Sequence, residues 1–150
     1  MRYTPIFLAA LAAAAPAAVP GVEITNVSAK TLSNNTLTYD FDVLDGTNGQ
    51  TVHCNSEWQE VFVLPRDAAT RNTAVTCSVP EYTASIYFPA GISGIQDWVT
   101  FIGLEGRSTR YLAQVQTGTS DYVCGHSGTD DVLSQCFTAP EVKIRAVEAS

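Results

Sequence analysis

The sequence predicts an all-β protein, a compact antiparallel β-barrel or sandwich stapled by two disulfides. Three observations support this prediction: apolar residues alternate with polar ones after residue 20, turn-forming residues interrupt this alternation at roughly 10-residue intervals, and an even number of cysteines follows an export leader. A helical period of 3.6 is almost absent. We favour a closed barrel over a sandwich, because a small secreted β protein must protect its sheet edges from other chains.

The amino terminus predicts a secretory signal peptide over residues 1–18, cleaved after Ala15 or Ala18. Arg2 supplies the early positive charge, and the apolar run that follows is shorter than the about 20 residues of a membrane-spanning helix. Residues 19–150 then form a single secreted domain of ordinary size. We therefore expect an extracellular protein without membrane insertion.

Export determines how the cysteines are interpreted. An even number of cysteines in an oxidising compartment predicts two disulfides, although spacing alone leaves three connectivities open. The four residues are Cys54, Cys77, Cys124 and Cys136.

The clearest strand lies in a hairpin over residues 36–54, whose turn is the Gly-rich and Asp-rich segment 45–49. Four apolar residues share one face of this strand and three polar residues share the other: Leu37, Tyr39, Phe41 and Val43, against Thr38, Asp40 and Asp42. The expected strands are, in chain order, 22–29, the hairpin 36–54, 58–64, 74–79, 84–88, 97–103, 110–117, 122–124 and 142–147. Single helical turns are expected at 66–72 and 130–135, because an Asp could cap each of them.

The formal net charge of −7 argues against nucleic acid and against anionic membrane surfaces as partners. Basic residues are scattered, and they come close together only at Arg107 with Arg110 and at Lys143 with Arg145. A phosphate backbone requires a continuous basic stripe instead.

No metal or cofactor is expected. His53 and His126 lie beside Cys54 and near Cys124, but disulfides would occupy these cysteines, and the spacing of a zinc site is absent. Because neighbouring strand residues point to opposite faces, His53 should be exposed when Cys54 is buried.

The sequence also shows no catalytic constellation. There is no Gly-x-Ser-x-Gly motif and no free cysteine, so we expect no catalytic residues and no enzyme activity. The alternative is an extracellular glycan hydrolase that uses paired carboxylates beside the sugar-stacking Trp58. Its candidate residues are Asp40, Asp42, Glu57 and Glu60.

Apolar residues at an expected turn after strand 84–88 suggest a recognition loop, since turns are ordinarily polar. Its candidate residues are Phe88, Pro89, Ile92 and Trp98. Two sequons, at Asn26 and Asn34, are candidate sites of N-glycosylation near the first strand and the first loop.

The carboxyl-terminal third resembles the major Alternaria allergen family of secreted fungal β-barrel proteins. The resemblance lies in the block Tyr122-Val123-Cys124 through the Gly-rich and Asp-rich loop 125–131 to Cys136, followed by the strand 142–147. Upstream, Cys54 at the end of a hairpin and Cys77 before the aromatic strand Ser85-Ile86-Tyr87-Phe88 follow the same order.

The resemblance implies a β-barrel with disulfides 54–77 and 124–136, fungal secretion and no established enzyme activity. It also implies an effector, elicitor or allergen-like role with a host extracellular defence protein or a small apolar ligand as partner. A fifth cysteine near the mature start is missing here, which favours a monomer or a non-covalent dimer. A structural role in the cell wall or on the spore surface is the remaining alternative.

Overall fold

The computed structural model describes residues 21–59, 72–88, 94–104 and 106–149, with the backbone alone for 58–59 and 72–74. Every regular element in these ranges is a strand, which confirms the all-β prediction. The strands are β1 Val22–Leu32, β2 Thr36–Asp45, β3 Gln50–Gln59, β4 Asn72–Cys77, β5 Tyr82–Tyr87, β6 Asp97–Leu104, β7 Arg110–Gln116, β8 Val123–Gly125, β9 Val132–Phe137, β10 Ile144–Arg145 and β11 Val147–Ala149.

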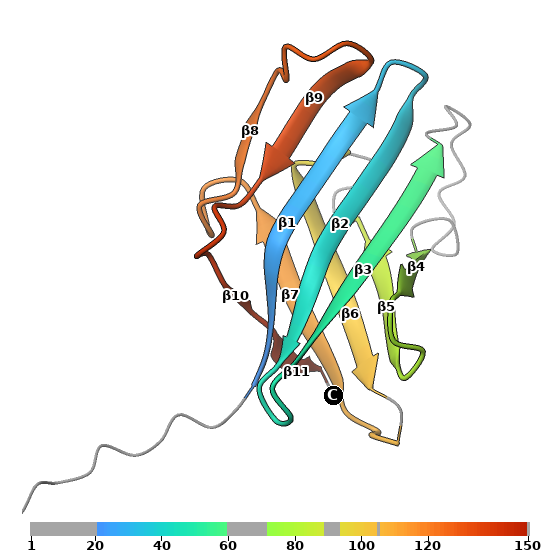
Figure 1. Ribbon diagram of the computed structural model, residues 1–150, viewed down its shortest axis with the longest axis vertical. Helices are drawn as coiled ribbons and strands as arrows, with labels where there is room; N and C mark the ends of the chain where they lie inside the picture. The colour runs from blue at the N-terminus through green and yellow to red at the C-terminus, as the bar shows by residue number, and fades with distance from the viewer. Residues whose placement is uncertain (1–20, 60–71, 89–93, 105, 150) are drawn as a thin grey trace, which may run out of the picture.

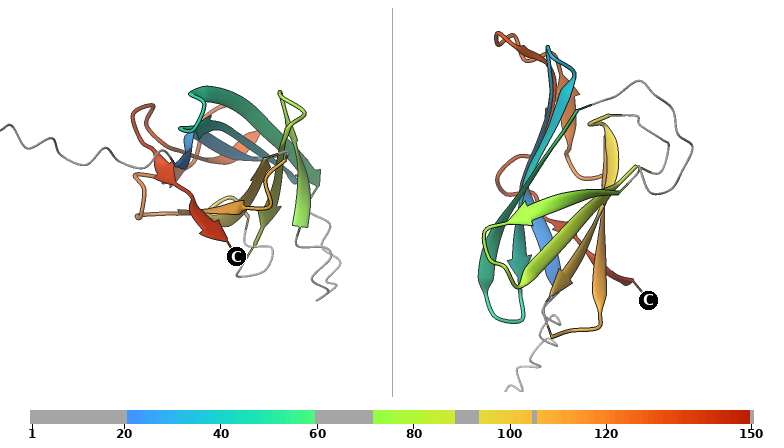
Figure 2. Two further views of the ribbon diagram at one scale, coloured as in Figure 1. Left: turned by 90° about the horizontal axis from the view of Figure 1, so that it is seen from below. Right: turned by 90° about the vertical axis from the view of Figure 1, so that its right-hand side faces the viewer.

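The strands form one antiparallel sheet that curls into a half-barrel (Figures 1 and 2). Strands β1 to β7 lie side by side in chain order, and the β8–β9 hairpin extends the sheet beyond β1. The carboxyl-terminal segment then brings the two ends together, because β10 pairs with β1 while β11, one residue later, pairs with β7. The short C-terminal strands thus connect the first strand of the curl to the last one.

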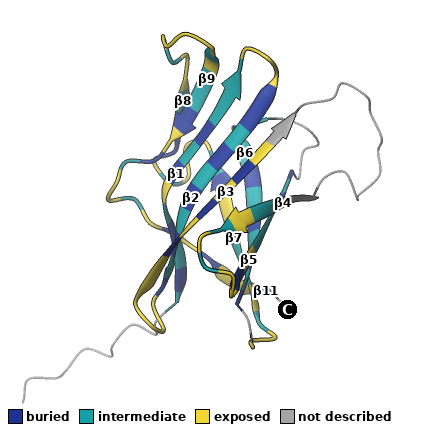
Figure 3. Ribbon diagram, turned by 45° about the vertical axis from the view of Figure 1, so that its right-hand side comes forward, coloured by how far each residue is buried: buried dark blue, intermediate teal, exposed yellow. Residues whose placement is uncertain are grey.

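Alternation along the strands determines which side chains form the core (Figure 3). Leu37, Tyr39, Phe41 and Val43 of β2 are at most 1% exposed, whereas the intervening Thr38, Asp40 and Asp42 are partly exposed. The two faces predicted for this strand are therefore confirmed. His53 is exposed and Cys54 fully buried, as their neighbouring positions on β3 require.

A β-bulge keeps β1 in phase with the core. Its register against β2 shifts between Thr25 and Ser28, where Asn26 adopts a positive φ of 50°. The extra residue allows Ile24 and Val27 to point inward although they are three positions apart. Below the bulge β1 pairs with β10, and above it with β9.

Trp98 lies at the centre of the core. Its ring is 5.2 Å from that of Tyr39 in an edge-on arrangement and 5.8 Å from that of Phe41, so it joins β6 to β2 across the barrel. The indole Nε1–H donates to the Tyr122 hydroxyl over 3.3 Å, and this hydroxyl donates to the Ile95 carbonyl over 2.6 Å. Tyr122 thereby attaches the start of β8 to the start of β6.

The prediction of a recognition loop was wrong for Phe88 and Trp98. Both side chains are 0% exposed, because Trp98 occupies an inward position of β6 and Phe88 continues the inward set of β5. Phe88 also contacts the Tyr39 ring, at 5.9 Å between centroids. Pro89 and Ile92 lie outside the described residues.

The two disulfides pair Cys54 with Cys77 and Cys124 with Cys136, as the family resemblance implied. Each one joins residues directly opposite each other on neighbouring antiparallel strands. Both lie where the strand pairing is short: β3 and β4 share two register pairs, and β8 has three residues. The bridges therefore hold together two places that few backbone hydrogen bonds support.

The expected helical turn at 130–135 was wrong. Residues 132–137 form β9, because Cys136 is bridged to β8 and the strand pairs with β1 from Ser28 to Leu32. The other expected turn, at 66–72, lies almost entirely outside the described residues, as does the predicted signal peptide. In the part of the chain that is described, no helix has the length and apolar character to cross a membrane.

Candidate functional site

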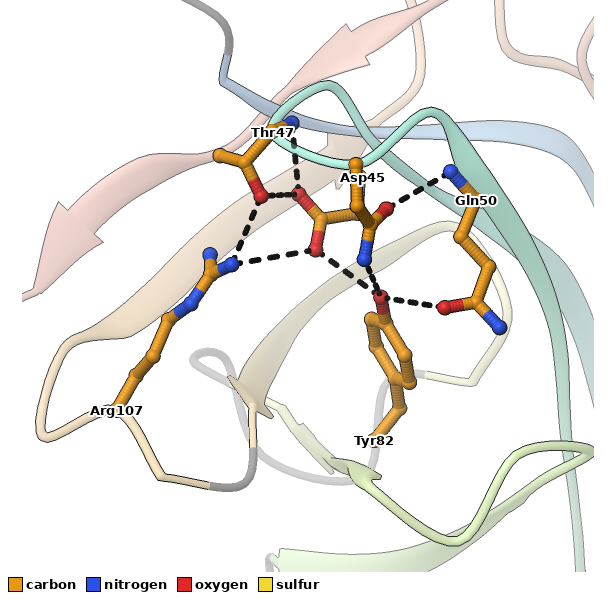
Figure 4. A network of polar contacts seen from close by, with 6 residues as sticks. Asp45, Thr47, Gln50, Tyr82 and Arg107 are labelled. Atoms are coloured by element: carbon orange, nitrogen blue, oxygen red, sulfur yellow. Dashed lines mark hydrogen bonds and ion pairs between the residues drawn. The ribbon is translucent and has the colours of Figure 1, made fainter.

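A polar network closes one end of the half-barrel around Asp45, the last residue of β2 (Figure 4). The Asp45 carboxylate is 0% exposed. Its Oδ1 accepts from the backbone N–H of Thr47 over 2.9 Å and from the Thr47 hydroxyl, while Oδ2 accepts from the Tyr82 hydroxyl over 3.0 Å. The turn 45–49 makes the first two bonds local, since an Asp can accept from the chain two residues on.

Tyr82, from β5, connects this turn to the opposite side of the barrel. Its hydroxyl accepts a hydrogen bond from Asn48 Nδ2 over 3.1 Å, and it lies 3.2 Å from Gln50 Oε1 as well as 3.0 Å from Asp45. The single hydroxyl proton is thus shared between two acceptors. The network joins the β2–β3 turn to the start of β5.

Arg107 completes the network from the turn between β6 and β7. Its Nη2 donates to the Thr47 hydroxyl over 2.8 Å and lies 3.9 Å from Asp45 Oδ2. The turn itself is closed by a hydrogen bond from the Arg107 N–H to the Leu104 carbonyl, with Gly106 at a φ of 74°. The Arg107 side chain remains 39% exposed, so it is held in position and still reaches solvent.

The protonation states of the network follow from these contacts. Burial raises the pKa of Asp45, but the hydrogen bonds from Thr47 and Tyr82 and the charge of Arg107 outweigh it, so the pKa falls below 3.8. Burial raises the pKa of Tyr82 above 10.0; the hydrogen bond to Asp45 and its charge add to the rise, while Asn48 and Arg107 oppose it. At neutral pH an ionised Asp45 is therefore bound by a protonated Tyr82.

A cleft begins beside this network and continues over the outer face of β5, β6 and β7. Its outer part, about 250 Å³, and its inner part, about 520 Å³, share Thr83, Gly103 and Arg110. The inner part in turn shares Glu81, Leu104 and Arg107 with a hollow of about 260 Å³ at the Asp45 network. We call the two hollows that share Thr83, Gly103 and Arg110 the Gly103 cleft.

Strand register builds the Gly103 cleft in two rows. The first row consists of Thr83 of β5, Gly103 of β6 and Arg110 of β7, which lie opposite one another. The second row lies two positions away on each strand and consists of Ser85, Phe101 and Leu112. The first row has no side chain at its centre, and the second has an aromatic ring there. The floor of the cleft is therefore a glycine, and one wall is Phe101.

The glycine at position 103 leaves room for the Thr83 side chain. A Cβ atom there would lie 2.6 Å from Thr83 Oγ1, which itself lies 3.5 Å from the Gly103 carbonyl and donates to it. A glycine inside a strand often marks such a close approach. Any larger residue would displace the Thr83 hydroxyl and reduce the cleft.

A second groove, of about 440 Å³, follows the seam between β7 and the carboxyl-terminal segment. Its charged residues are Lys143 and Arg145, and Lys143 Nζ lies 3.8 Å from Glu23 Oε2. Leu112 and Val147 face each other across the register at its edge. The two pairs of basic residues that lie close together in the sequence are Arg107 with Arg110 and Lys143 with Arg145. Both pairs therefore line hollows on the side of the barrel formed by β5, β6 and β7.

The carboxylates of the hydrolase alternative lie elsewhere, on the outer face of β2 and β3. His53 Nδ1 lies 2.8 Å from Asp42 Oδ1, and His53 Nε2 lies 3.7 Å from Asp40 Oδ1. Asn26 Nδ2 donates to Asp42 Oδ2 over 2.8 Å. Glu57 lies further along β3, opposite Thr38, and Glu60 is outside the described residues.

Among the described residues, no group of three or more His, Cys, Asp and Glu side chains has the geometry of a metal site. Asn26 and Asn34, the two sequon asparagines, are both exposed. Asn34 Oδ1 accepts from the Thr36 N–H over 3.1 Å, while the Nδ2 of Asn26 is engaged with Asp42. Glycosylation of either residue stays a prediction.

Among the described residues, the exposed large apolar side chains are Val147 of β11, which is 58% exposed, and three residues of the β8–β9 hairpin. Val123 and Phe137 are opposite each other and are 57% and 47% exposed, and Leu133 of β9 is 51% exposed. The sequence prediction missed this surface because residues 130–135 were expected to form a helical turn.

The sequence prediction also missed the Gly103 cleft and the Asp45 network. Two signals pointed toward them: Arg107 and Arg110 lie close together in a mostly acidic chain, and Gly103 stands between the apolar residues Ile102 and Leu104. Comparisons with protein-family models, with curated proteins and with solved structures find no match for this chain.

Proposed function

We propose that this chain is a secreted binding protein that holds a small ligand in the Gly103 cleft without transforming it. The observation that carries the proposal is the cleft itself, whose walls are strand positions in register and whose inner end is Arg107, tied to Asp45 and Thr47. Such preorganised walls lose little conformational entropy when a ligand binds. Two intrachain disulfides are compatible with an extracellular location.

The nature of the polar groups favours binding over catalysis. Both oxygens of the Asp45 carboxylate accept hydrogen bonds, and its pKa is lowered, so it is a weak base at neutral pH. In the two described hollows that form the Gly103 cleft, the titratable residues are Glu81, Arg107 and Arg110. Among the described residues that line these hollows, one carboxylate lies beside two guanidinium groups, whereas glycoside hydrolysis uses a pair of carboxyl groups.

The resemblance to the Alternaria allergen family supports the same role. It extends the proposal to an effector-like or allergen-like fungal protein that acts at a host surface. In that setting the exposed apolar residues Val123, Leu133 and Phe137 are the surface we would assign to a host extracellular protein.

Glycan hydrolysis is the second candidate function, and the contact between His53 and two carboxylates is the observation in its favour. Asp40 and Asp42 nevertheless occupy the same face of one strand, at the solvent side of the sheet. Glycosidases place their two carboxylates on opposite sides of the bond that is cleaved. This arrangement is therefore less suited to hydrolysis than the cleft is to binding.

The experiment that separates the two functions incubates the secreted protein with a panel of small molecules and oligosaccharides and measures both retention and turnover. We expect a ligand to be retained and recovered unchanged, with retention lost in Arg110→Gln and kept in the Asp40→Asn, Asp42→Asn double variant. Turnover that disappears in the double variant would establish hydrolysis and contradict the proposal.

A further inference from the structure

We infer that the ligand of the Gly103 cleft is an acidic saccharide, a chain of sugars that carry carboxylates. The inference rests on the proposed function, because it names the ligand class of the same cleft. It follows from four properties of the described side chains that line the cleft: a cation available to a ligand, hydroxyl groups, an aromatic wall and one carboxylate.

The cation is Arg110. Its side chain is exposed beside the glycine floor, and none of the ion pairs between described residues involves it. A guanidinium presents a planar fork of N–H donors that matches a carboxylate in two parallel hydrogen bonds. Arg107 lies in the inner part of the cleft and supplies a second cation, oriented by Thr47. The two arginines therefore offer two cationic groups in one hollow.

Groups that recognise sugar hydroxyls surround Arg110. Thr83 and Ser85 contribute hydroxyls from β5, and Glu81 contributes a carboxylate that can accept from sugar O–H groups. Phe101 forms the wall, and an aromatic ring of this kind packs against the apolar face of a sugar. Ligand sites of this type combine such an apolar wall with a few placed polar groups.

These features also discriminate between polyanions. Glu81 repels any polyanion, but its carboxylate can accept hydrogen bonds from the hydroxyl groups of a saccharide, which an acidic peptide lacks. An acidic saccharide satisfies all four properties together.

The test uses isothermal titration of the secreted, disulfide-bonded protein with a short oligomer of galacturonic acid. The matched probes are the methyl ester of this oligomer, a sulfated neutral oligosaccharide and poly-L-glutamate. We expect the free acid to bind, with the methyl ester weaker by about tenfold or more, because esterification removes the charge that Arg110 binds. If the sulfated oligosaccharide binds as tightly as the free acid, the cleft does not distinguish a sulfate from a carboxylate. This result would overturn the carboxylate assignment.

The variants test the position of the ligand. Arg110→Gln should weaken binding by about tenfold or more, and Gly103→Ala should weaken it similarly by filling the floor. Lys30→Gln, on β1 and outside both hollows, should change binding less than about twofold. If Gly103→Ala unfolds the protein, the Arg110→Gln variant still tests the position of the ligand, provided that this variant unfolds at the same midpoint as the parent protein. Acid binding that Arg110→Gln leaves intact would overturn the inference.

The failure of the inference differs from the failure of the proposed function. If poly-L-glutamate or a small organic acid of the panel binds in an Arg110-dependent manner and the saccharide does not, the ligand class is wrong and the binding role stands. If no probe and no panel compound perturbs the nuclear magnetic resonance signals of Thr83, Gly103 and Arg110, the proposed function itself is wrong.

Discussion

The hydroxyl of Tyr82 lies 3.0 Å from Asp45 Oδ2 and donates to it, although the two residues are 37 positions apart in the sequence. This contact connects β5 to the end of β2, on opposite sides of the barrel. A buried carboxylate is stable only when hydrogen bonds and a counter-charge replace its water, and Tyr82, Thr47 and Arg107 supply them. The network therefore holds the Arg107 side chain beside the Gly103 cleft.

Tyr82→Phe should destabilise the protein by about 1–3 kcal/mol, because it removes the hydrogen bond to a buried charge and leaves Asp45 with one partner fewer. Denaturant unfolding measures this change. Tyr87→Phe, on the outer face of the same strand, is the matched control and should be nearly neutral. Equal effects of the two substitutions would show that the Asp45 contact contributes little.

Acid should weaken the fold through Asp45. Because its folded pKa lies below 3.8, its contribution to stability is fully present above that pH and is lost as the pH falls through the folded value. In Asp45→Asn the free energy of unfolding should be lower at neutral pH and should decline less between about pH 5 and pH 2. The control is Asp130→Asn at an exposed position, which should keep the decline of the parent protein.

Alkali should weaken the fold through Tyr122. Burial raises its pKa; the hydrogen bond from Trp98 opposes this rise, and the charge of Asp97 adds to it. Since the folded pKa exceeds the unfolded value of 10.0, stability is fully present below that pH and is lost as the pH rises above it.

Tyr122→Phe should therefore cost about 1–3 kcal/mol at neutral pH, where Trp98 Nε1 and the Ile95 carbonyl lose their partner. It should also remove part of the alkaline decline, as measured by unfolding together with tyrosinate absorbance. Tyr111→Phe is the control, and an unchanged alkaline decline in Tyr122→Phe would contradict the assignment.

Removing the Cys124–Cys136 bridge should destabilise the protein by about 3 kcal/mol, as the closure of a 12-residue separation predicts. Because β8 is three residues long, its amides should also lose protection from hydrogen exchange in the Cys124→Ser, Cys136→Ser double variant. The corresponding Cys54, Cys77 variant should expose the β3–β4 junction instead. Protection of residues 123–125 in the first variant would show that pairing alone holds β8.

Trp98→Ala should destabilise the protein by about 3–5 kcal/mol, because it opens a cavity beside Tyr39 and Phe41. Phe137→Ala, at a residue that is 47% exposed, should cost less than about 1 kcal/mol. Thermal unfolding of both variants measures the contrast. If Trp98→Ala left the stability unchanged, Trp98 would belong to the exposed surface that the sequence suggested.

Most strands could be predicted from the sequence because alternation is a local property. Tyr39 and Asp40 are neighbours, and an extended chain must direct them to opposite faces whatever surrounds them. The same argument predicted that His53 is exposed beside the buried Cys54. It failed at residues 132–137, where a weak local pattern became a strand through pairing with β1 and bridging to β8.

The Gly103 cleft could not be predicted in this way. Thr83, Gly103 and Arg110 belong to three strands, and whether they meet depends on the register of two ladders. A shift of one residue in either ladder would turn a row of side chains to the other face of the sheet. The apolar residues Phe88 and Trp98 illustrate the same limit, because composition does not distinguish an exposed loop from the inward positions of two packed strands.

Local sequence patterns were enough to predict that this protein is built of strands and which residues of each strand share a face. These properties depend on backbone geometry and composition, which act within a few residues. The contact of Asp45 with Tyr82, the burial of Trp98 and the glycine floor between Thr83 and Arg110 emerged with the folded sheet alone. Such contacts arise from the curl and register of the whole sheet, which no short segment of the chain encodes.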